Sequence, residues 1–219
     1  MSAPALEDCA AQLSVDERER AARFHFERDR RRYVVTRGRL RQLLARELGV
    51  RPAEVLFDYG VHGKPSLGGR FVASPVSFNV SHSQDLALIG ITAGIDVGVD
   101  IEALRALADE EQLARRHFST AEFAEYQVVD TAARQRAFFC CWTRKEALVK
   151  ALGQGLSYPL DAFDVSVDPA SEPRLRRMND LAGENSGWCV GGFDPAPGYA
   201  AAVAVRGRSC TLQLLNSSS

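Results

Sequence analysis

The sequence predicts an α+β protein built from two similar lobes. The chain has 219 residues, a length that suits between one and two domains. Hydrophobic residues make up 46% of it and charged residues 25%, a balance typical of globular proteins that excludes disordered and fibrous classes. Each half also offers helical segments and about three strands, and this repetition predicts the two lobes.

In the first half, apolar residues at helical spacing predict one or two helices over residues 14–49, and Gly49 is expected to end them. From Val76 to Ser81 apolar and polar residues alternate, which predicts a half-buried strand. Further strands are expected over residues 55–59, 86–92 and 97–101.

In the second half, Ser119 and Glu122 form a capping-box pattern that predicts the start of a helix. A long helix is expected over residues 134–152, stopped by Gly153 and Gly155. The strands expected there cover residues 162–167, 188–193, 199–205 and 211–215. We expect an N-terminal lobe over residues 1–96, a C-terminal lobe over 97–215, and a disordered tail over 216–219.

The N-terminus has neither a basic start nor an apolar core, so no signal peptide is expected. The longest apolar stretch, Leu86 to Ile95, is about half a membrane span. The five cysteines are odd in number and lack C-x-x-C spacing, which favours reduced thiols and argues against a disulfide scaffold or a zinc site. These observations together predict a cytoplasmic protein.

Positive charge is concentrated near the N-terminus, although the whole chain has a net charge of −1. Between Arg18 and Arg46 there are eleven arginines and only three acidic residues, a local charge of +8. Either this is a solvated basic helix face, or it is a site for a polyanion such as a phosphate-rich ligand, an acidic protein or nucleic acid. The chain has only three lysines, Lys64, Lys145 and Lys150, which suggests positions that need a compact ammonium.

Two acidic residues lie at the end of the strand expected over residues 97–101, in Gly98-Val99-Asp100-Ile101-Glu102. Side chains at i and i+2 of a strand share a face, so Asp100 and Glu102 point the same way and repel each other unless they are protonated or bridged by a cation. Carboxylate pairs of this kind suit Mg²⁺, which completes its shell with water and phosphate oxygens. The alternative is a plain polar end to the strand.

The long helix carries Trp142, Glu146 and Lys150 on one face, because each is four residues from the next. This spacing alone indicates an ordinary surface ion pair. The apolar residues just before Trp142 indicate instead a largely buried helix, on which a carboxylate and an ammonium need partners.

Two further motifs lie in the first half. Gly63-Lys64-Pro65 is not a P-loop, since Pro65 stands where Ser or Thr is required. Asn79-Val80-Ser81-His82-Ser83 ends a strand and lacks the glycines of a nucleophile elbow. Each is compatible with a structural role when taken alone.

Taken in order, G-K-P, F-N-x-S-H-S, G-V-D-I-E and W-T-x-K-E-A-x-x-K resemble the motifs of 4′-phosphopantetheinyl transferases of the Sfp type, in the holo-carrier-protein synthase superfamily. The resemblance runs from about Arg23 to Ser157 and is most specific around Lys150 and the following Gly153-Gln154-Gly155-Leu156. It implies a monomer with two lobes in a pseudo-twofold arrangement. It also implies transfer of the phosphopantetheine arm of coenzyme A to a serine of an apo carrier protein, with release of adenosine 3′,5′-bisphosphate.

The resemblance further implies roles for individual residues. Asp100, Glu102 and Glu146 would hold Mg²⁺ against the pyrophosphate, and Glu146 is also the candidate base, directly or through water. Lys150 would neutralise the leaving group, with Lys145 as a supporting phosphate contact. The residues implied in coenzyme A binding are Lys64, Pro65, Ser81, His82, Lys145, Lys150 and Arg32, with Arg18 or Arg20 as alternatives to Arg32 at the 3′-phosphate.

The implied partner is an acidic acyl, polyketide or peptidyl carrier, which would dock around Leu104, Arg105, Leu107, Arg115 and Phe118 unless these are ordinary core and surface positions. The first alternative function is a non-catalytic coenzyme A- or carrier-binding protein on the same fold. A nucleic-acid-binding module is disfavoured by the near-neutral charge and the lack of interleaved aromatic residues. A different phosphoryl-transfer enzyme is disfavoured by the lack of a nucleotide-binding glycine loop.

Overall fold

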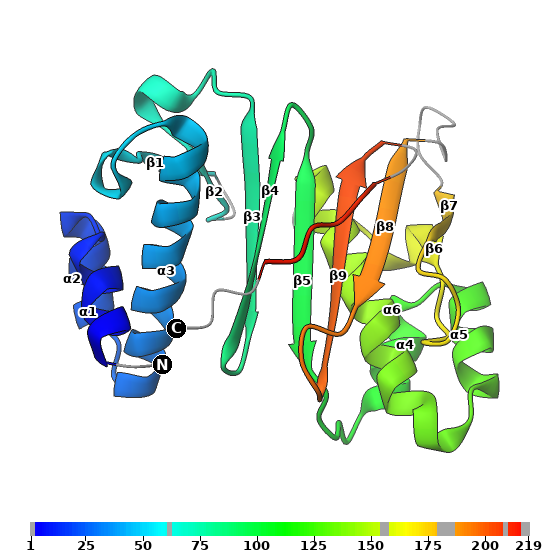
Figure 1. Ribbon diagram of the computed structural model, residues 1–219. Coiled ribbons are helices and arrows are strands. Elements are labelled where there is room, and N and C mark those ends of the chain that lie inside the picture. The colour runs from blue at the N-terminus through cyan, green and yellow to red at the C-terminus, as the bar shows by residue number, and fades with distance from the viewer. Residues whose placement is uncertain (1–2, 61–62, 154–157, 179–186, 208–209, 216–219) are drawn as a thin grey trace. The chain divides into compact units, whose positions relative to one another are not determined.

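The computed structural model describes residues 3–60, 63–153, 158–178, 187–207 and 210–215, and confirms the α+β class. The chain divides into two compact units (Figure 1). The first unit runs to Ser77 and includes the end of the chain from Leu212, and the second runs from Phe78 to Thr211. The pseudo-twofold relation between lobes stays a prediction, and the tail expected over 216–219 lies outside the described residues.

The first unit is built on three helices, of which the last two confirm the helical prediction for residues 14–49. Gly49 ends the long helix in a left-handed conformation with φ 66°, which glycine adopts at no steric cost. The first helix was not predicted; it packs closely on the third, since a Cβ on Gly38 would lie 2.6 Å from the Cβ of Cys9. The helices are α1 (Ala3–Ala11), α2 (Val15–Ala22) and α3 (Glu27–Leu48).

A buried carboxylate fixes α2 to α3. Glu17 is 1% exposed and binds the guanidinium groups of both Arg37 and Arg41. Arg41 also donates to the carbonyl oxygens of Pro52 and Val55, each at 2.9 Å. Two of the eleven arginines of the basic segment therefore stabilise the core of this unit and are not available to a polyanion.

A short hairpin completes the first unit. Strand β1 (Phe57–Tyr59) pairs antiparallel with β2 (Pro65–Leu67), and two short 3₁₀ helices, η1 (Pro52–Glu54) and η2 (Gly69–Phe71), flank the pair. The Gly-Lys-Pro motif lies at the start of β2, where the backbone N–H of Gly60 donates to the Lys64 carbonyl oxygen at 3.1 Å.

The second unit contains two sheets and the long helix α6 (Thr131–Leu152) (Figure 1). Strands β3 (Val76–Ser83) and β4 (Leu86–Ala93) form one pair. The other sheet is antiparallel, in the order β5 (Val97–Ala103), β9 (Tyr199–Arg206) and β8 (Trp188–Phe193). The strands expected in these five places are confirmed, as is the end of α6 at Gly153, whereas Gly155 lies outside the described residues.

Shorter elements cover the far side of α6. The capping box is confirmed at the start of α5 (Thr120–Val128), where Ser119 Oγ accepts from the Glu122 N–H at 3.2 Å. Helix α4 (Glu110–His117) and strand β7 (Leu175–Met178) were not predicted, and the remaining elements are η4 (Leu160–Ala162) and β6 (Phe163–Val165). The strand predicted over residues 211–215 is wrong: this segment is mostly exposed and forms no strand in the described residues.

The expectation that all cysteines are reduced is wrong for two of them. Cys189 of β8 and Cys210 form a disulfide, with Cα atoms 6.1 Å apart. They are 21 residues apart in sequence, and they meet because β9 runs antiparallel to β8 and returns the chain to the start of β8. Cys9, Cys140 and Cys141 are free and buried. None of the helices in the described residues has both the length and the apolar character needed to cross a bilayer.

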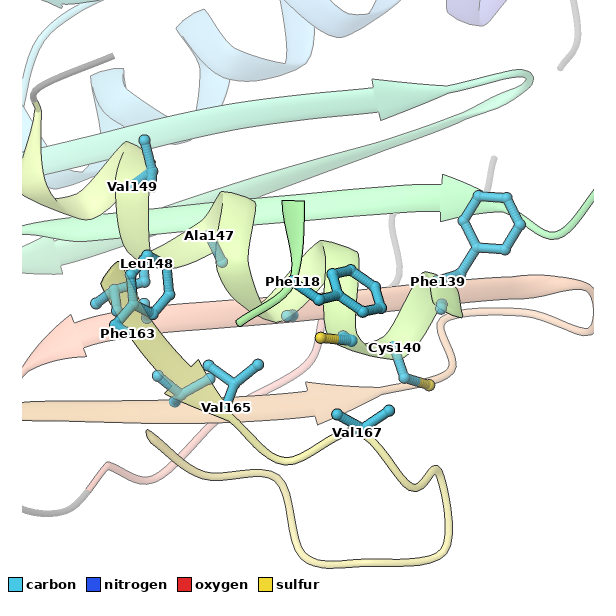
Figure 2. Packing of buried hydrophobic residues seen from close by; sticks show 14 of the residues in the cluster. Phe118, Phe139, Cys140, Ala147, Leu148, Val149, Phe163, Val165 and Val167 are labelled. Carbon is cyan, nitrogen blue, oxygen red and sulfur yellow. The ribbon is translucent and has the colours of Figure 1, made fainter. Parts of the chain in front are cut away.

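The main core lies between α6 and the elements around it (Figure 2). Phe139 and Leu148 of α6 are buried, and they share the cluster with Phe163 and Val165 of β6. The β5–β9–β8 sheet contributes small side chains on the face that α6 covers, the alanines at positions 200, 202 and 204 of β9. Helix and strand backbones can therefore approach closely.

Gly98 is the point of closest approach between β5 and α6. A Cβ atom at this position would overlap the carbonyl oxygen of Ala147 and the backbone N of Ala151. Asp100 and Glu102 follow Gly98 at two-residue intervals on the same strand, so all three share the face toward α6.

Replacing this glycine is the sharpest test of the packing. Gly98→Ala should lower the free energy of unfolding by more than about 3 kcal/mol, because neither backbone can yield as a flexible side chain would. Urea denaturation of the purified variant measures the loss. Gly60→Ala is the control, since the nearest atom to its Cβ is 3.8 Å away; equal stability of the two variants would contradict the close packing.

Candidate active site

Strand β5 and helix α6 carry five of the predicted site residues: Asp100 and Glu102 lie on the strand, and Lys145, Glu146 and Lys150 lie on the helix. Lys150 donates to Asp100 Oδ1 with Nζ at 2.6 Å. Glu146 lies one turn before Lys150 on α6, and its carboxylate interacts electrostatically with Asp100, Glu102 and Lys150. The packing at Gly98 thus brings three carboxylates and one ammonium into a single electrostatic cluster.

Ser81 of β3 completes the contact between Asp100 and Lys150. Its hydroxyl donates to Asp100 Oδ1 at 2.8 Å and accepts from Lys150 Nζ at 3.2 Å. The backbone N–H of Ile101 also donates to this hydroxyl at 3.4 Å. Ser81 and Asp100 are both buried, so the orientation of the carboxylate is fixed from two sides.

The cluster has more negative charge than its own cations compensate. Burial raises the pKa of Asp100, although the Lys150 ammonium acts against the shift. Burial also raises the pKa of Glu146, and the negative charge of Asp100 raises it further. Desolvated carboxylates that repel one another mark a place where a further cation would be stabilising.

One atom of the cluster supports that interpretation directly. Asp100 Oδ2 is buried and makes no hydrogen bond within the described part of the chain. Leaving a buried carboxylate oxygen unpaired costs free energy, so such atoms call for a specific reason. This oxygen suits a hard divalent cation, because such ions prefer carboxylate oxygens as ligands.

In this structure the carboxylates bind cations of the protein itself. Lys150 is bound to Asp100, and Arg105 donates to Glu102 Oε2 at 3.0 Å. Among the described residues, no three acidic, histidine or cysteine side chains lie close enough together to hold a metal ion. The donor set of the predicted magnesium site is present on β5 and α6, with its charges partly neutralised by these two basic residues.

Lys145 lies in a different environment from the one expected of a phosphate contact. Its side chain is fully buried and forms an ion pair with Glu122 of α5 at 2.6 Å. The ammonium also donates to the carbonyl oxygens of Leu160 and Phe163, at 2.6 and 2.8 Å. All three donors of the ammonium are used within the core, so we leave Lys145 out of the proposed coenzyme A site.

The remaining predicted contacts are distributed over both units. His82 is exposed on β3, next to Ser81 and in the same unit as the carboxylates. Arg32 of α3, Lys64 and Pro65 belong to the first unit, and the structure defines them within that unit only. Arg32 interacts with Asp29 at 3.5 Å.

The expected carrier-docking surface is altered in one respect. Phe118 is 3% exposed and stacks on Phe138 with ring centroids 5.5 Å apart, so it belongs to the core. Leu104 and Leu107 are partly buried against the same core. Arg105 and Arg115 are left as the more exposed members of the predicted surface.

Two features of the site were missed from the sequence. Glu122 is the buried ion-pair partner of Lys145, whereas the capping-box pattern in the sequence predicted only that it caps the start of a helix. Ser83 contacts Glu102, with its hydroxyl donating to Oε2 at 2.8 Å. The available signal was the spacing of Ser81 and Ser83, which puts both side chains on the strand face that Asn79 also occupies.

Comparisons with known proteins identify the family of the chain. The family model described as "4'-phosphopantetheinyl transferase superfamily" matches residues 96–204, and the one described as "4'-phosphopantetheinyl transferase, N-terminal" matches residues 2–93. The 4′-phosphopantetheinyl transferase HetI of Nostoc is 40% identical over 92% of this chain and 82% of its own length. The chain belongs to the 4′-phosphopantetheinyl transferase superfamily.

A second relative is more distant. The 4′-phosphopantetheinyl transferase Sfp of Bacillus subtilis is 26% identical over 87% of this chain and 81% of its own length. The holo-[acyl-carrier-protein] synthase of Thermotoga maritima, a solved structure, is 21% identical, covers 52% of this chain and 65% of its own, and has a TM-score of 0.40, too low to support an argument. One family model ends at residue 93 and the other begins at residue 96, whereas the sequence divides into the two compact units after Ser77. The lobe boundary expected at residue 96 stays a prediction.

The core role of Lys145 in this transferase can be tested by stability. Lys145→Met should lower the free energy of unfolding by about 3–5 kcal/mol, because it leaves Glu122 charged, buried and unpaired. The double variant with Glu122→Gln should regain part of the loss, since that charge is then removed as well. Urea denaturation measures both variants, and a single variant as stable as the parent would show that the pair is not a buried ion pair.

Proposed function

We propose that this transferase moves the 4′-phosphopantetheine arm of coenzyme A to a serine of an apo carrier protein, in a Mg²⁺-dependent reaction that releases adenosine 3′,5′-bisphosphate. The observation that carries the proposal is the ion pair of the buried Asp100 with the partly buried Lys150 beside Glu146, with an oxygen of Asp100 that makes no hydrogen bond in the described residues. Membership of the superfamily and the names of the relatives support the reaction class. We therefore set aside the non-catalytic alternative.

In the proposed reaction, the serine oxygen of the carrier attacks the phosphorus that bears the pantetheine arm. A phosphorus–oxygen bond of the pyrophosphate breaks, and its electron pair leaves with the 5′-phosphate of adenosine 3′,5′-bisphosphate. The serine proton passes to a base. Catalysis of this kind is mostly positioning and electrostatic stabilisation of the charge on the phosphate oxygens.

The residues that would hold Mg²⁺ are Asp100, Glu102 and Glu146. The surplus negative charge and the unpartnered oxygen of Asp100 fit a hard cation. When bound, the ion would neutralise charge that develops on the phosphate oxygens. The three side chains would bind one ion together only if both β5 and α6 are in place, because two carboxylates come from the strand and one from the helix.

Glu146 is also the candidate base. Its carboxylate belongs to the cluster with Asp100 and Lys150, where it would accept the serine proton directly or through a water molecule. Lys150, one helical turn on, would neutralise the leaving 5′-phosphate with a compact ammonium. Its side chain is 28% exposed, so the ammonium can reach both Asp100 and a ligand at the surface.

The residues proposed to contact coenzyme A are Ser81, His82, Lys64, Pro65 and Arg32. Arg18 or Arg20 are alternatives to Arg32 at the 3′-phosphate. Each of these residues matches a family position or supplies a charge suited to phosphate. We propose that the enzyme acts as a monomer on an acidic carrier of fatty-acid, polyketide or nonribosomal-peptide synthesis, guided by the exposed arginines Arg105 and Arg115.

The intact mass of an apo carrier protein tests the reaction. After incubation with the enzyme, coenzyme A and Mg²⁺, the carrier should gain the mass of one phosphopantetheine group, because the arm becomes covalently attached. A parallel sample with EDTA should show no gain. Absence of any gain across fatty-acid, polyketide and peptidyl carriers would refute the proposed function.

The role of Lys150 is tested by substitution. Lys150→Ala should lower kcat about 10²- to 10³-fold, the usual cost of losing one preorganised electrostatic contact to the reacting group. Lys150→Arg should recover only part of the rate, because the guanidinium retains the charge but not the compact shape. Initial rates of carrier modification measure both variants, and an unchanged kcat in the alanine variant would remove Lys150 from the mechanism.

A further inference from the structure

Three side chains of β3 bind three backbone N–H groups of β5, although the two strands belong to different sheets. The side chains alternate along β3, at positions 79, 81 and 83, and so face the same way. We call them the β3 ladder. Its bonds run from Val99 N–H to Asn79 Oδ1 (2.9 Å), from Ile101 N–H to Ser81 Oγ (3.4 Å) and from Ala103 N–H to Ser83 Oγ (3.0 Å).

The ladder takes the place of a neighbouring strand's backbone. Buried N–H groups at a strand edge require acceptors, and a strand without a backbone partner on that side must find them in side chains. Amide and hydroxyl oxygens spaced two residues apart match the spacing of these N–H groups along β5. The ladder accounts for why short polar residues occupy these three positions.

The two serines of the ladder have a second partner that Asn79 does not have in the described structure. Ser81 Oγ donates to Asp100 Oδ1 and Ser83 Oγ donates to Glu102 Oε2, each at 2.8 Å. A hydroxyl has a single donor, so in each serine this donor is committed to a carboxylate. Each serine therefore links the β5 backbone to a carboxylate of the same strand.

The two carboxylates are held in the same way. On Asp100, both Ser81 and Lys150 bind Oδ1, while Oδ2 is the buried oxygen without a partner. On Glu102, both Ser83 and Arg105 bind Oε2. One oxygen of each carboxylate is thus fixed by the protein, which orients the other for a ligand.

We propose that Ser83 is a positioning residue that orients Glu102 for the divalent cation. The inference rests on the proposed function, which makes Glu102 a metal ligand. Arg105 is about half exposed and must yield to solvent and ligand, whereas Ser83 is half-buried and also anchored to the Ala103 N–H. Ser81 plays the same part toward Asp100, but it is also a proposed coenzyme A contact, so Ser83 is the residue at which positioning can be tested by itself.

The decisive measurement is the affinity for Mn²⁺ in the presence of coenzyme A, followed by the electron paramagnetic resonance signal of the free ion. Ser83→Ala should bind Mn²⁺ about 10- to 100-fold more weakly, the usual effect of removing an outer partner of a metal ligand. Ser83→Thr should restore the affinity, because it returns the hydroxyl. In carrier modification, Ser83→Ala should raise the Mg²⁺ concentration for half-maximal rate and leave kcat at saturating Mg²⁺ close to that of the parent.

Asn79→Ala is the matched control, because it removes a ladder bond to the β5 backbone without touching a carboxylate. It should lower thermal stability and leave the Mn²⁺ affinity near that of the parent. Three results would refute the positioning role of Ser83. They are a normal Mn²⁺ affinity in Ser83→Ala, an affinity in Ser83→Thr as low as that in Ser83→Ala, and an equal loss of affinity in Asn79→Ala.

A fourth variant separates this inference from the proposed function. Glu102→Gln should abolish most of the Mn²⁺ binding, since it removes the charged ligand itself. Normal Mn²⁺ affinity in Glu102→Gln would refute Glu102 as a ligand, and with it the metal site on which the role of Ser83 depends. Loss of binding in Glu102→Gln with normal binding in Ser83→Ala would refute the positioning role alone.

Discussion

The close approach of α6 to β5 at Gly98 is the constraint on which the candidate site depends. Without a Cβ at this position the helix backbone lies directly against the strand. The alanines of the neighbouring β9 have small side chains, so the helix can also approach the rest of that sheet face closely. Lys150 can then form its ion pair with Asp100, and Glu146 comes within electrostatic reach of both strand carboxylates. A larger residue at Gly98 would push apart the two elements that carry the proposed site. The arrangement of this site is therefore a consequence of backbone packing as much as of the acidic and basic side chains themselves.

Within six residues, helix α6 carries charged side chains in two different environments, one fully paired and one incompletely compensated. Lys145 is buried with Glu122, and that carboxylate also accepts from the N–H groups of Ser119 and Val165, so both partners are satisfied. Asp100 and Glu146 are instead desolvated, close to each other and incompletely compensated, and burial raises the pKa of each. A fully paired buried network specifies a unique structure, whereas an under-compensated one stores free energy that a ligand can recover. This contrast distinguishes the structural Lys145 from Lys150, the lysine of the proposed site.

Much of the second unit was predictable from local patterns. Alternation predicted β3, the local sequence predicted β5, β8 and β9 as strands, and the glycine that follows α6 predicted its end, because these signals depend on neighbouring residues only. The Cys189–Cys210 disulfide was missed because it depends on how β9 returns beside β8. Lys145 was interpreted as a phosphate contact because a motif lists residues without saying which face of the helix each occupies; it is about 140° around the helix from Lys150. The contacts of Ser83 with β5 could not be predicted, because they depend on how strands of two different sheets are aligned, and the periodicity of the sequence carries no information about that alignment.

Adjacent residues of α6 thus have different surroundings, since Lys145 lies in the core while Glu146 belongs to the charged cluster on β5. An insertion or deletion of one residue upstream of them in α6 would rotate everything that follows by about 100°. Such a change would turn a core lysine toward the site and a site carboxylate toward the core at once, so it would damage folding and chemistry together. Length variation among related sequences should therefore be absent from this helix and concentrated in the loops that precede and follow it.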